Sequence, residues 1–142
     1  RASLGGPEPF QGADGVFDRL VPASTGIGGA NAAGAALTAG VLAVRGAKVA
    51  LVPSPLQCPA PNYGSSFSRA VEIAAGGGRL LTVSGTASID PAGNSVFIGD
   101  MDRQVGLTLD VVHAILASRG MDWKDVCRGL DPLRPSVQGS WP

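Results

Sequence analysis

Apolar and polar side chains alternate most clearly over residues 79–89, which predicts a strand with two different faces. Successive side chains of a strand point to opposite sides, so this stretch has one apolar face and one face rich in hydroxyl groups. The apolar face consists of Leu81, Val83, Gly85, Ala87 and Ile89. The opposite face consists of Leu80, Thr82, Ser84, Thr86 and Ser88.

A second strand is predicted just upstream, over residues 68–74. Val71 and Ile73 share one of its faces, and Ala70 and Glu72 share the other. Three consecutive glycines separate the two strands and can adopt the positive φ values that a hairpin turn needs. The two stretches are therefore expected to pair as a hairpin.

Several shorter segments complete the predicted sheet. Apolar runs at 40–44 and 48–52 are split by Arg-Gly-Ala, which predicts a hairpin or a strand pair. Residues 16–21 are expected to form a further short strand, and residues 95–98 a short extended piece after a DPAGN turn. The proline-rich stretch 53–61 is expected to be extended, because each proline removes a donor and restricts its neighbour.

A helix is predicted over residues 101–119, after a good N-cap at Asp100 and before a glycine that ends it. Apolar residues recur in it at helical spacing, which predicts a stripe that packs across the apolar face of the hairpin. The stripe consists of Val105, Leu109, Val112 and Leu116, widened by Val111 and Ile115. A sheet with a helix on one face is an α+β fold.

Composition excludes several classes of protein. Lysine plus arginine equals aspartate plus glutamate at 11 each in 142 residues, so no charge excess points to a nucleic-acid partner or an acidic arm. The two cysteines form no CxxC pattern, so neither a disulfide scaffold nor a zinc site is expected. No signal peptide is evident, and residues 30–44 are too short and too weakly apolar to span a bilayer. These observations favour a cytoplasmic protein.

The run from Gly78 to Val126 resembles the first half of the RidA fold. Its strand ends in a Gly-x-Ala-like segment, followed by Gly-Asp, a glutamine in the first turn of the helix and a later Asp-Val. After Arg128 the chain departs from this pattern, because its tail has three prolines and no periodicity. The fold expected from the resemblance is an incomplete RidA-like mixed sheet with a helix on one face.

Three motifs are more specific, and together they are similar to the chorismatases of bacterial secondary metabolism. They read TGIGGANAAGAAL, VPSPLQCPAPNYGSSFSRA and SGTASI, and the resemblance covers about residues 16–128. It implies that residues 1–61 end a degenerate N-terminal half, 62–128 begin the catalytic half, and 129–142 form a tail outside the family.

This resemblance implies a chorismate-cleaving hydrolase or lyase. The products would be pyruvate and either a dihydroxycyclohexadiene carboxylate or a hydroxybenzoate, without a cofactor or a metal. The family's catalytic glutamate has no counterpart in this chain, so no catalytic residue is assigned and the chain is expected to be a fragment. The expected partner is the small molecule chorismate, not nucleic acid or a membrane, and both a monomer and a RidA-like oligomer stay open. Two alternatives are a RidA-type enamine or imine deaminase and a non-catalytic, ligand-binding remnant.

Tyr63 and Arg69 are the strongest candidates for binding substrate. A tyrosine hydroxyl can donate to a carboxylate, and a guanidinium can bind one through two parallel hydrogen bonds. The alternative is a solvated strand edge. The neighbouring Ser65, Ser66 and Ser68 are weaker candidates, since loop serines usually bond to nearby backbone.

Gly85, Thr86 and Ala87 are the remaining candidates. A glycine inside a strand often marks the close approach of a ligand or of another backbone segment, and tight packing under the helix is the alternative here. The resemblance places Ala87 at the wall of the substrate site, where it helps to set which product forms and favours the hydrolytic, dihydroxy-diene one.

Other noticeable residues are assigned structural roles. His113 is three positions after Asp110 on the helix, so the two are expected to pair. The thiols of Cys58 and Cys127 have no activating neighbours in sequence, and Trp123 is expected to pack the helix end against the sheet. The glycine-rich stretch 26–31 lacks the spacing of a nucleotide-binding loop and is expected to be a tight turn.

Overall fold

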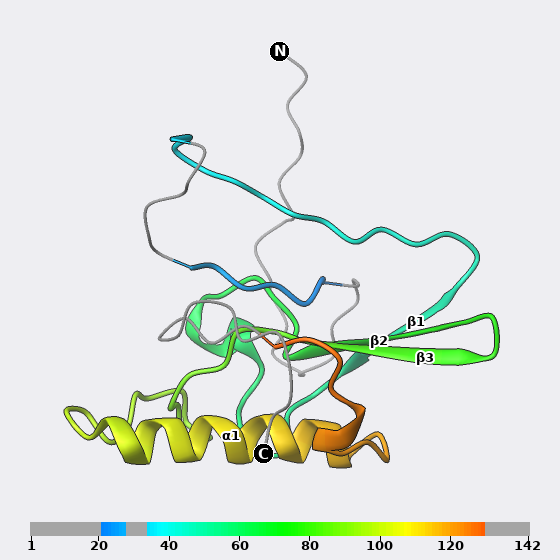
Figure 1. Cartoon of the computed structure of the whole chain (residues 1–142). Helices are drawn as coiled ribbons and strands as arrows, with labels where there is room; N and C mark the ends of the chain where they lie inside the picture. The colour runs from blue at the N-terminus through cyan, green and yellow to red at the C-terminus, as the bar shows by residue number, and fades with distance from the viewer. Residues whose placement is uncertain (1–20, 28–33, 130–142) are drawn as a thin grey trace.

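The computed structural model describes residues 21–27 and 34–129, which form a three-stranded antiparallel sheet with one long helix across one face (Figure 1). The strands are β1 (Lys48–Val52), β2 (Ala70–Ala75) and β3 (Gly78–Val83), hydrogen-bonded in that order. The helix is α1 (Met101–Ala117), and two short 3-10 helices span Ala60–Tyr63 and Trp123–Asp125. This is an α+β arrangement, as expected. None of the helices in the described residues is long and apolar enough to cross a membrane.

The β2–β3 hairpin confirms the main prediction from sequence. Gly76 and Gly77 form its turn, with φ values of 58° and 79°, as the two central residues of a tight hairpin turn require. β3 is shorter than predicted and ends at Val83. β2 begins only at Ala70, which pairs with Val83, so no strand lies opposite the continuation of β3.

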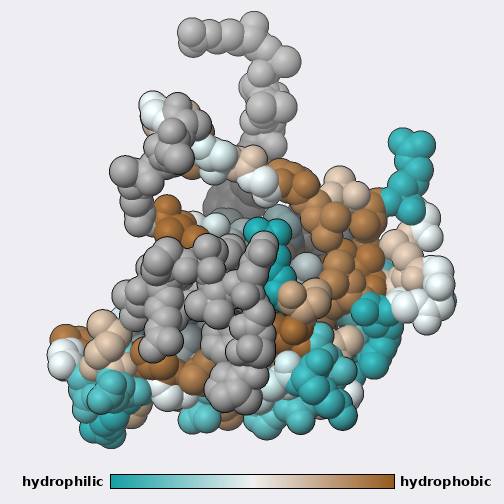
Figure 2. Space-filling model, viewed as in Figure 1, coloured by the Kyte–Doolittle hydropathy of each residue, from teal (hydrophilic) through white to brown (hydrophobic). Residues whose placement is uncertain are grey.

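The predicted hairpin between residues 40–44 and 48–52 is wrong. Residues 48–52 do form β1, but β1 pairs with β2, so that Val52 lies opposite Ala70. This pairing buries Val52 against the helix, whereas residues 40–44 form no strand and leave Val41 88% exposed. Figure 2 shows that hydrophobic residues gather on part of the surface of the molecule.

Three other sequence predictions need correction or lie outside the described residues. Residues 95–98 are not extended throughout, because Phe97 has a φ of 58°, although Ser95 bridges to Ile89. The proline-rich stretch 53–61 is not extended throughout, because it bends and then enters the 3-10 helix that begins at Ala60. The predicted strand 16–21, except for its last residue, lies outside the part that the structure describes.

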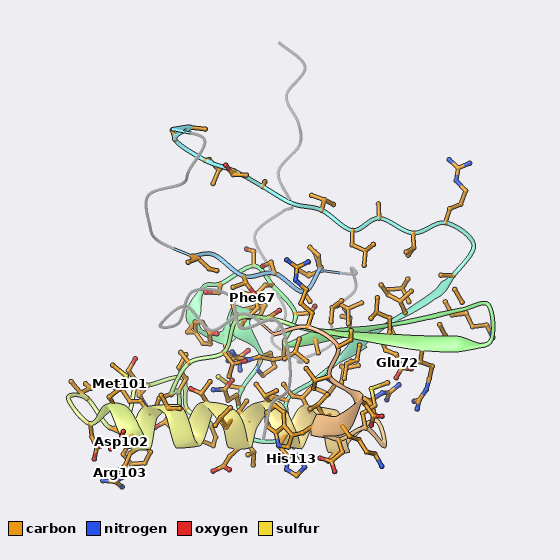
Figure 3. The ribbon with its side chains drawn as sticks, viewed as in Figure 1. Phe67, Glu72, Met101, Asp102, Arg103 and His113 are labelled. Atoms are coloured by element: carbon orange, nitrogen blue, oxygen red, sulfur yellow. The ribbon has the colours of Figure 1, made fainter. Side chains whose placement is uncertain are left out.

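The core lies between the helix and one face of the sheet. Val52, Ala70, Val111 and Ile115 are its buried members, and Leu81, Val83 and Leu107 pack against them. Leu81 and Val83 therefore face the helix, as the alternation in sequence predicted. Figure 3 shows side chains of the sheet and of α1 meeting between the two layers.

The apolar stripe of α1 is rotated from the one predicted. Val111 and Ile115 are fully buried, whereas Val105 is 41% and Leu109 38% exposed. Leu116 is buried, as expected. Residues 107, 111 and 115 follow one another at intervals of four on the helix, so this row defines the face that meets the sheet. Val111 and Ile115, which were predicted only to widen the stripe, therefore lie at its centre.

The two ends of α1 follow the predicted chemistry. The Asp100 carboxylate accepts a hydrogen bond from the backbone N–H of Arg103 at 3.1 Å, which confirms it as the N-cap. The helix ends at Ala117, two residues earlier than predicted, and Gly120 has a φ of 68° just beyond it.

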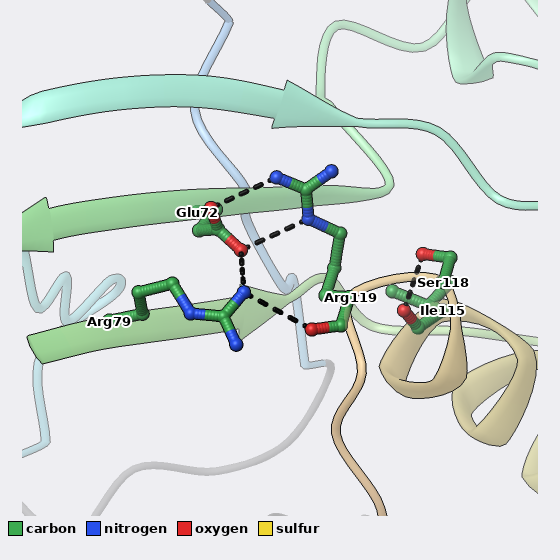
Figure 4. Close-up of polar contacts among 5 residues, drawn as sticks. All are labelled: Glu72, Arg79, Ile115, Ser118 and Arg119. Atoms are coloured by element: carbon green, nitrogen blue, oxygen red, sulfur yellow. Dashed lines mark hydrogen bonds and ion pairs between the residues drawn. The ribbon is translucent and has the colours of Figure 1, made fainter.

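A partly buried ion-pair network joins the end of α1 to the hairpin, and no sequence pattern indicated it (Figure 4). Glu72 on β2 accepts two hydrogen bonds from the Arg119 guanidinium, at 2.9 and 3.0 Å. Arg79 on β3 contacts the same carboxylate at 3.4 Å and donates to the backbone carbonyl of Arg119 at 3.1 Å. The hydrogen bonds from Arg119 lower the pKa of Glu72, against the opposing effect of burial.

Candidate functional site

Arg69, immediately before β2, is held in place by the proline-rich segment upstream. Its side chain is almost fully buried, and its Nε and Nη2 donate to the backbone carbonyl of Cys58 at 3.0 and 2.8 Å. Both hydrogen bonds converge on one oxygen, so the guanidinium is held in one orientation. This contact also draws the segment 53–67, hereafter the connector, against the start of β2.

Two aromatic rings flank the same guanidinium. The Cζ atom of Arg69 lies 5.3 Å from the centroid of the Tyr63 ring and 5.6 Å from that of Phe67. Both distances fall in the range in which a cation is attracted to a ring face. The 3-10 helix Ala60–Tyr63 places Tyr63, and Gly64 with a φ of 83° ends it. The structure therefore brings together Tyr63 and Arg69, as the sequence analysis expected.

Donors remain available on both predicted residues. The Nη1 atom of Arg69 and the hydroxyl of Tyr63 make no hydrogen bond with any described residue. Among the described residues, Oε1 of Gln57 is the only side-chain nitrogen or oxygen atom that is both closed off from solvent and without a hydrogen-bond partner. Nη1 of Arg69 has no partner either, so it must keep some access to solvent. A fixed cation with a free N–H group beside a free hydroxyl is suited to binding a carboxylate.

Gln57 links the connector to the chain that follows β3. Its side chain is almost fully buried, and Nε2 donates to the backbone carbonyls of Ala87 at 2.9 Å and Ile89 at 3.1 Å. Ala87, a predicted site residue, contributes its backbone carbonyl to this link, and the residue itself is exposed. Sequence reasoning missed Gln57, because nothing in the sequence indicates that a glutamine in this segment meets carbonyls about 30 positions away.

Gly85 makes room for another backbone segment. Its N–H donates to the Thr25 hydroxyl at 2.7 Å and to the Ser24 carbonyl at 3.3 Å. A Cβ at this position would lie only 2.8 Å from Cγ2 of Thr25. The close approach anticipated from the glycine is therefore that of residues 21–27, and the alternative of packing under the helix is wrong.

The hydroxyl-rich face of the predicted strand bonds to backbone. Ser84 donates to the carbonyl of Ser68 and accepts from the Ser24 N–H at 2.9 Å. Thr86, a predicted site residue, donates to the Ser84 carbonyl at 3.0 Å. Thr82 and Ser88 also donate to carbonyls, those of Val71 and Val96. These hydroxyls therefore hold the chain together, and Gly85 and Thr86 belong to this contact and not to the Arg69 cluster.

Replacing Gly85 with alanine is expected to loosen residues 21–27 from the sheet. Forcing a methyl group into this contact should lower the free energy of unfolding by about 1–3 kcal/mol. Thr25→Ser removes the methyl group that clashes and keeps the hydroxyl, so the double variant should recover part of the loss. Urea denaturation of both single variants and the double variant measures this. Equal stability of Gly85→Ala and the unaltered protein would contradict the contact.

His113 and Trp123 make a different contact from the one predicted. Nε2 of His113 lies 3.3 Å from Oδ1 of Asp122, so the expected pairing with Asp110 is wrong. The Trp123 and His113 rings stack, with centroids 6.0 Å apart and an interplanar angle of 14°. Trp123 therefore packs on the helix at His113, instead of between the helix end and the sheet.

The remaining reactive groups offer little for catalysis. Cys58 is half-buried and Cys127 is exposed, and both are free thiols. No group of three or more metal-ligating side chains occurs among residues 21–27 and 34–129. The carboxyls with shifted pKa values, Glu72 and Asp90, are both shifted downward, which is opposite to what a general acid needs at neutral pH.

No protein-family model matches this sequence, and neither a curated protein nor a solved structure matches it.

Proposed function

We propose that this chain supplies a carboxylate-binding part of a chorismatase-type enzyme that cleaves chorismate to pyruvate and a cyclic carboxylic acid. The observation that carries the proposal is the state of Arg69. Its buried guanidinium lies near the Tyr63 and Phe67 rings and donates to the Cys58 carbonyl, while Nη1 is unpaired among the described residues. A cation held this way binds an anion without first losing side-chain freedom, which favours binding.

The motifs that resemble the chorismatases include this cluster. Chorismate carries two carboxylates, and Tyr63 beside Arg69 offers one of them a charged and a neutral donor. The described residues do not supply an acid suited to protonating the enol ether, because Glu72 is held ionised by Arg119. The proposed contribution of these residues is therefore to bind and orient the substrate.

Titration calorimetry with chorismate, followed by an assay for released pyruvate, tests this function. Saturable binding is expected, and the methyl ester of the ligand should bind less well because it lacks the charge. Absence of binding would overturn the proposal. Ammonia release from an amino-acid-derived enamine would instead support the deaminase alternative.

Tyr63→Phe is expected to weaken chorismate binding by about tenfold or more, since a hydrogen bond to a charged group is worth roughly 1.5–3 kcal/mol. The variant keeps the ring over Arg69, so stability should change little. Ser66, a weaker candidate in sequence, is exposed in the structure, so Ser66→Ala is the matched control, which removes a hydroxyl from the same loop and should leave the affinity unchanged. An unchanged affinity in Tyr63→Phe would remove Tyr63 from the site.

A further inference from the structure

The carbonyl oxygen of the Gln57 side chain is a buried acceptor without a donor. It is sealed from solvent and makes no hydrogen bond with the described residues. The orientation of the amide is fixed, because Nε2 faces two backbone carbonyls, at 2.9 and 3.1 Å. A flipped amide would place oxygen against oxygen at both contacts. Buried acceptors in folded proteins are nearly always satisfied, so an unsatisfied one requires an explanation.

The surroundings of Gln57 are those of the proposed carboxylate site. The Arg69 guanidinium bonds to the carbonyl of Cys58, the next residue along the chain. The turn at Gly93 lies beside Tyr63 and Cys58, because a Cβ added at Gly93 would be 3.5 Å from Cδ1 of Tyr63 and 3.6 Å from Sγ of Cys58. Cys58, the neighbour of Gln57 in sequence, therefore contacts both the Arg69 guanidinium and the turn beside the Tyr63 ring.

We propose that Oε1 of Gln57 accepts a hydrogen bond from a hydroxyl group of the ligand whose carboxylate binds Arg69. This rests on the proposed function and adds a specificity-determining residue, since Gln57 selects for the hydroxyl group of the cyclic carboxylate. An unpaired buried acceptor disfavours the empty site and any ligand without a donor, so it discriminates more strongly than an apolar wall would.

Oε1 is sealed in the structure, so the proposal requires the turn beside Tyr63 and Cys58 to move before a hydroxyl can reach it. Asp90 closes this turn, its Oδ1 accepting hydrogen bonds from the N–H groups of Ala92 and Asn94, each at 2.9 Å. Gly93, with a φ of 92°, places no side chain over Tyr63 and Cys58. The turn is thus a small unit with its own hydrogen bonds, and none of its residues 90–94 belongs to the buried core.

The test compares ligands that differ by one hydroxyl: benzoate against 3-hydroxybenzoate and 4-hydroxybenzoate. At least one hydroxylated ligand is expected to bind the unaltered protein about tenfold more tightly than benzoate. In Gln57→Met this preference should fall to about one. General damage to the connector weakens all three ligands together, so only the ratio reports the proposed contact.

The outcomes separate the two proposals. If chorismate binds but the hydroxyl gives no preference, or if the preference survives in Gln57→Met, this inference is overturned and the proposed function stands. If no carboxylate binds, both fail. Should Gln57→Met not fold, the side-chain amide resonance of Gln57 in the unaltered protein decides, since it should shift with the preferred hydroxybenzoate and not with benzoate. Equal shifts would indicate a bound water only and would overturn the inference.

Discussion

Replacing Ile115 with alanine is expected to lower the free energy of unfolding by about 2–5 kcal/mol, the usual cost of truncating a large buried side chain. Ile115 is fully buried, on the face of α1 that packs against Val52 and Ala70 of the sheet. Folded domains are stable by only about 5–15 kcal/mol, so this single change removes a large part of the total. The core of the described residues is small, which leaves few other contacts to compensate.

Leu109→Ala is the matched control for this prediction. Leu109 lies on the same helix and loses the same kind of side chain, but it is 38% exposed, so the cost should stay below about 1 kcal/mol. Urea denaturation of both variants, monitored by circular dichroism, gives the two free energies of unfolding. If Leu109→Ala cost more than Ile115→Ala, the helix would face the sheet with the stripe predicted from sequence, and the packing described above would be wrong.

The same comparison shows why the helix could be predicted and its packing could not. The N-cap, the apolar spacing and the terminal glycine are local, so they indicated the helix to within two residues at its C-terminal end. Apolar residues cover more than one face of α1, however, and the spacing alone did not choose between the rows through Leu109 and Ile115. The choice depends on the sheet, because the apolar side chains of β3 and of β1 meet the second row.

The sheet was predicted where the turn was local and missed where the pairing was distant. The glycines between the two strands predicted the β2–β3 hairpin, and two of them have the positive φ values that its turn requires. β1 was assigned to the wrong neighbour, because Arg-Gly-Ala resembles a hairpin turn, whereas its true partner β2 lies beyond the whole connector. The hydrogen bonds from Arg69 to the Cys58 carbonyl hold the connector against the start of β2. Sequence patterns do not reveal these hydrogen bonds.

The candidate site divides in the same way. Tyr63 and Arg69 were predicted because they are close in sequence and chemically suited to a carboxylate. Gln57 was missed because its partners are the carbonyls of Ala87 and Ile89, far along the chain. Gly85 was recognised as a point of close approach, but the approaching segment, which contains Thr25, could not be named from sequence.

Removing the partner of Glu72 is expected to destabilise the protein strongly. In Arg119→Met the Glu72 carboxylate would stay buried without its two hydrogen bonds at 2.9 and 3.0 Å. Removing one partner of a mostly buried carboxylate is more costly than replacing both sides, and the half-exposed Arg79, 3.4 Å away, compensates only part of the charge that is left. Arg79→Met is the control. Its side chain is half exposed and its single contact is longer, at 3.4 Å, so the loss should be clearly smaller.

The contribution of Glu72 should depend on pH in a defined direction. Hydrogen bonds from Arg119 lower the folded-state pKa below its ordinary value of 4.5. Unfolding therefore favours proton uptake by this carboxyl, and the stabilisation it provides is complete above about pH 4.5. It is lost as the pH falls through the lower, folded-state pKa. Denaturation midpoints measured from pH 7 downward should thus decline in this acidic window.

Asp90 must be separated from Glu72, because its pKa is also lowered, chiefly by the hydrogen bond from the Asn94 backbone. Glu72→Gln should flatten part of the acidic decline, Asp90→Asn another part, and the double variant most of it. The two groups differ in location, since one joins α1 to the hairpin and the other closes an exposed turn. If Glu72→Gln left the decline unchanged, the ion pair would not contribute to stability, and α1 would be held to the sheet by the contacts of Ile115 and its neighbours alone.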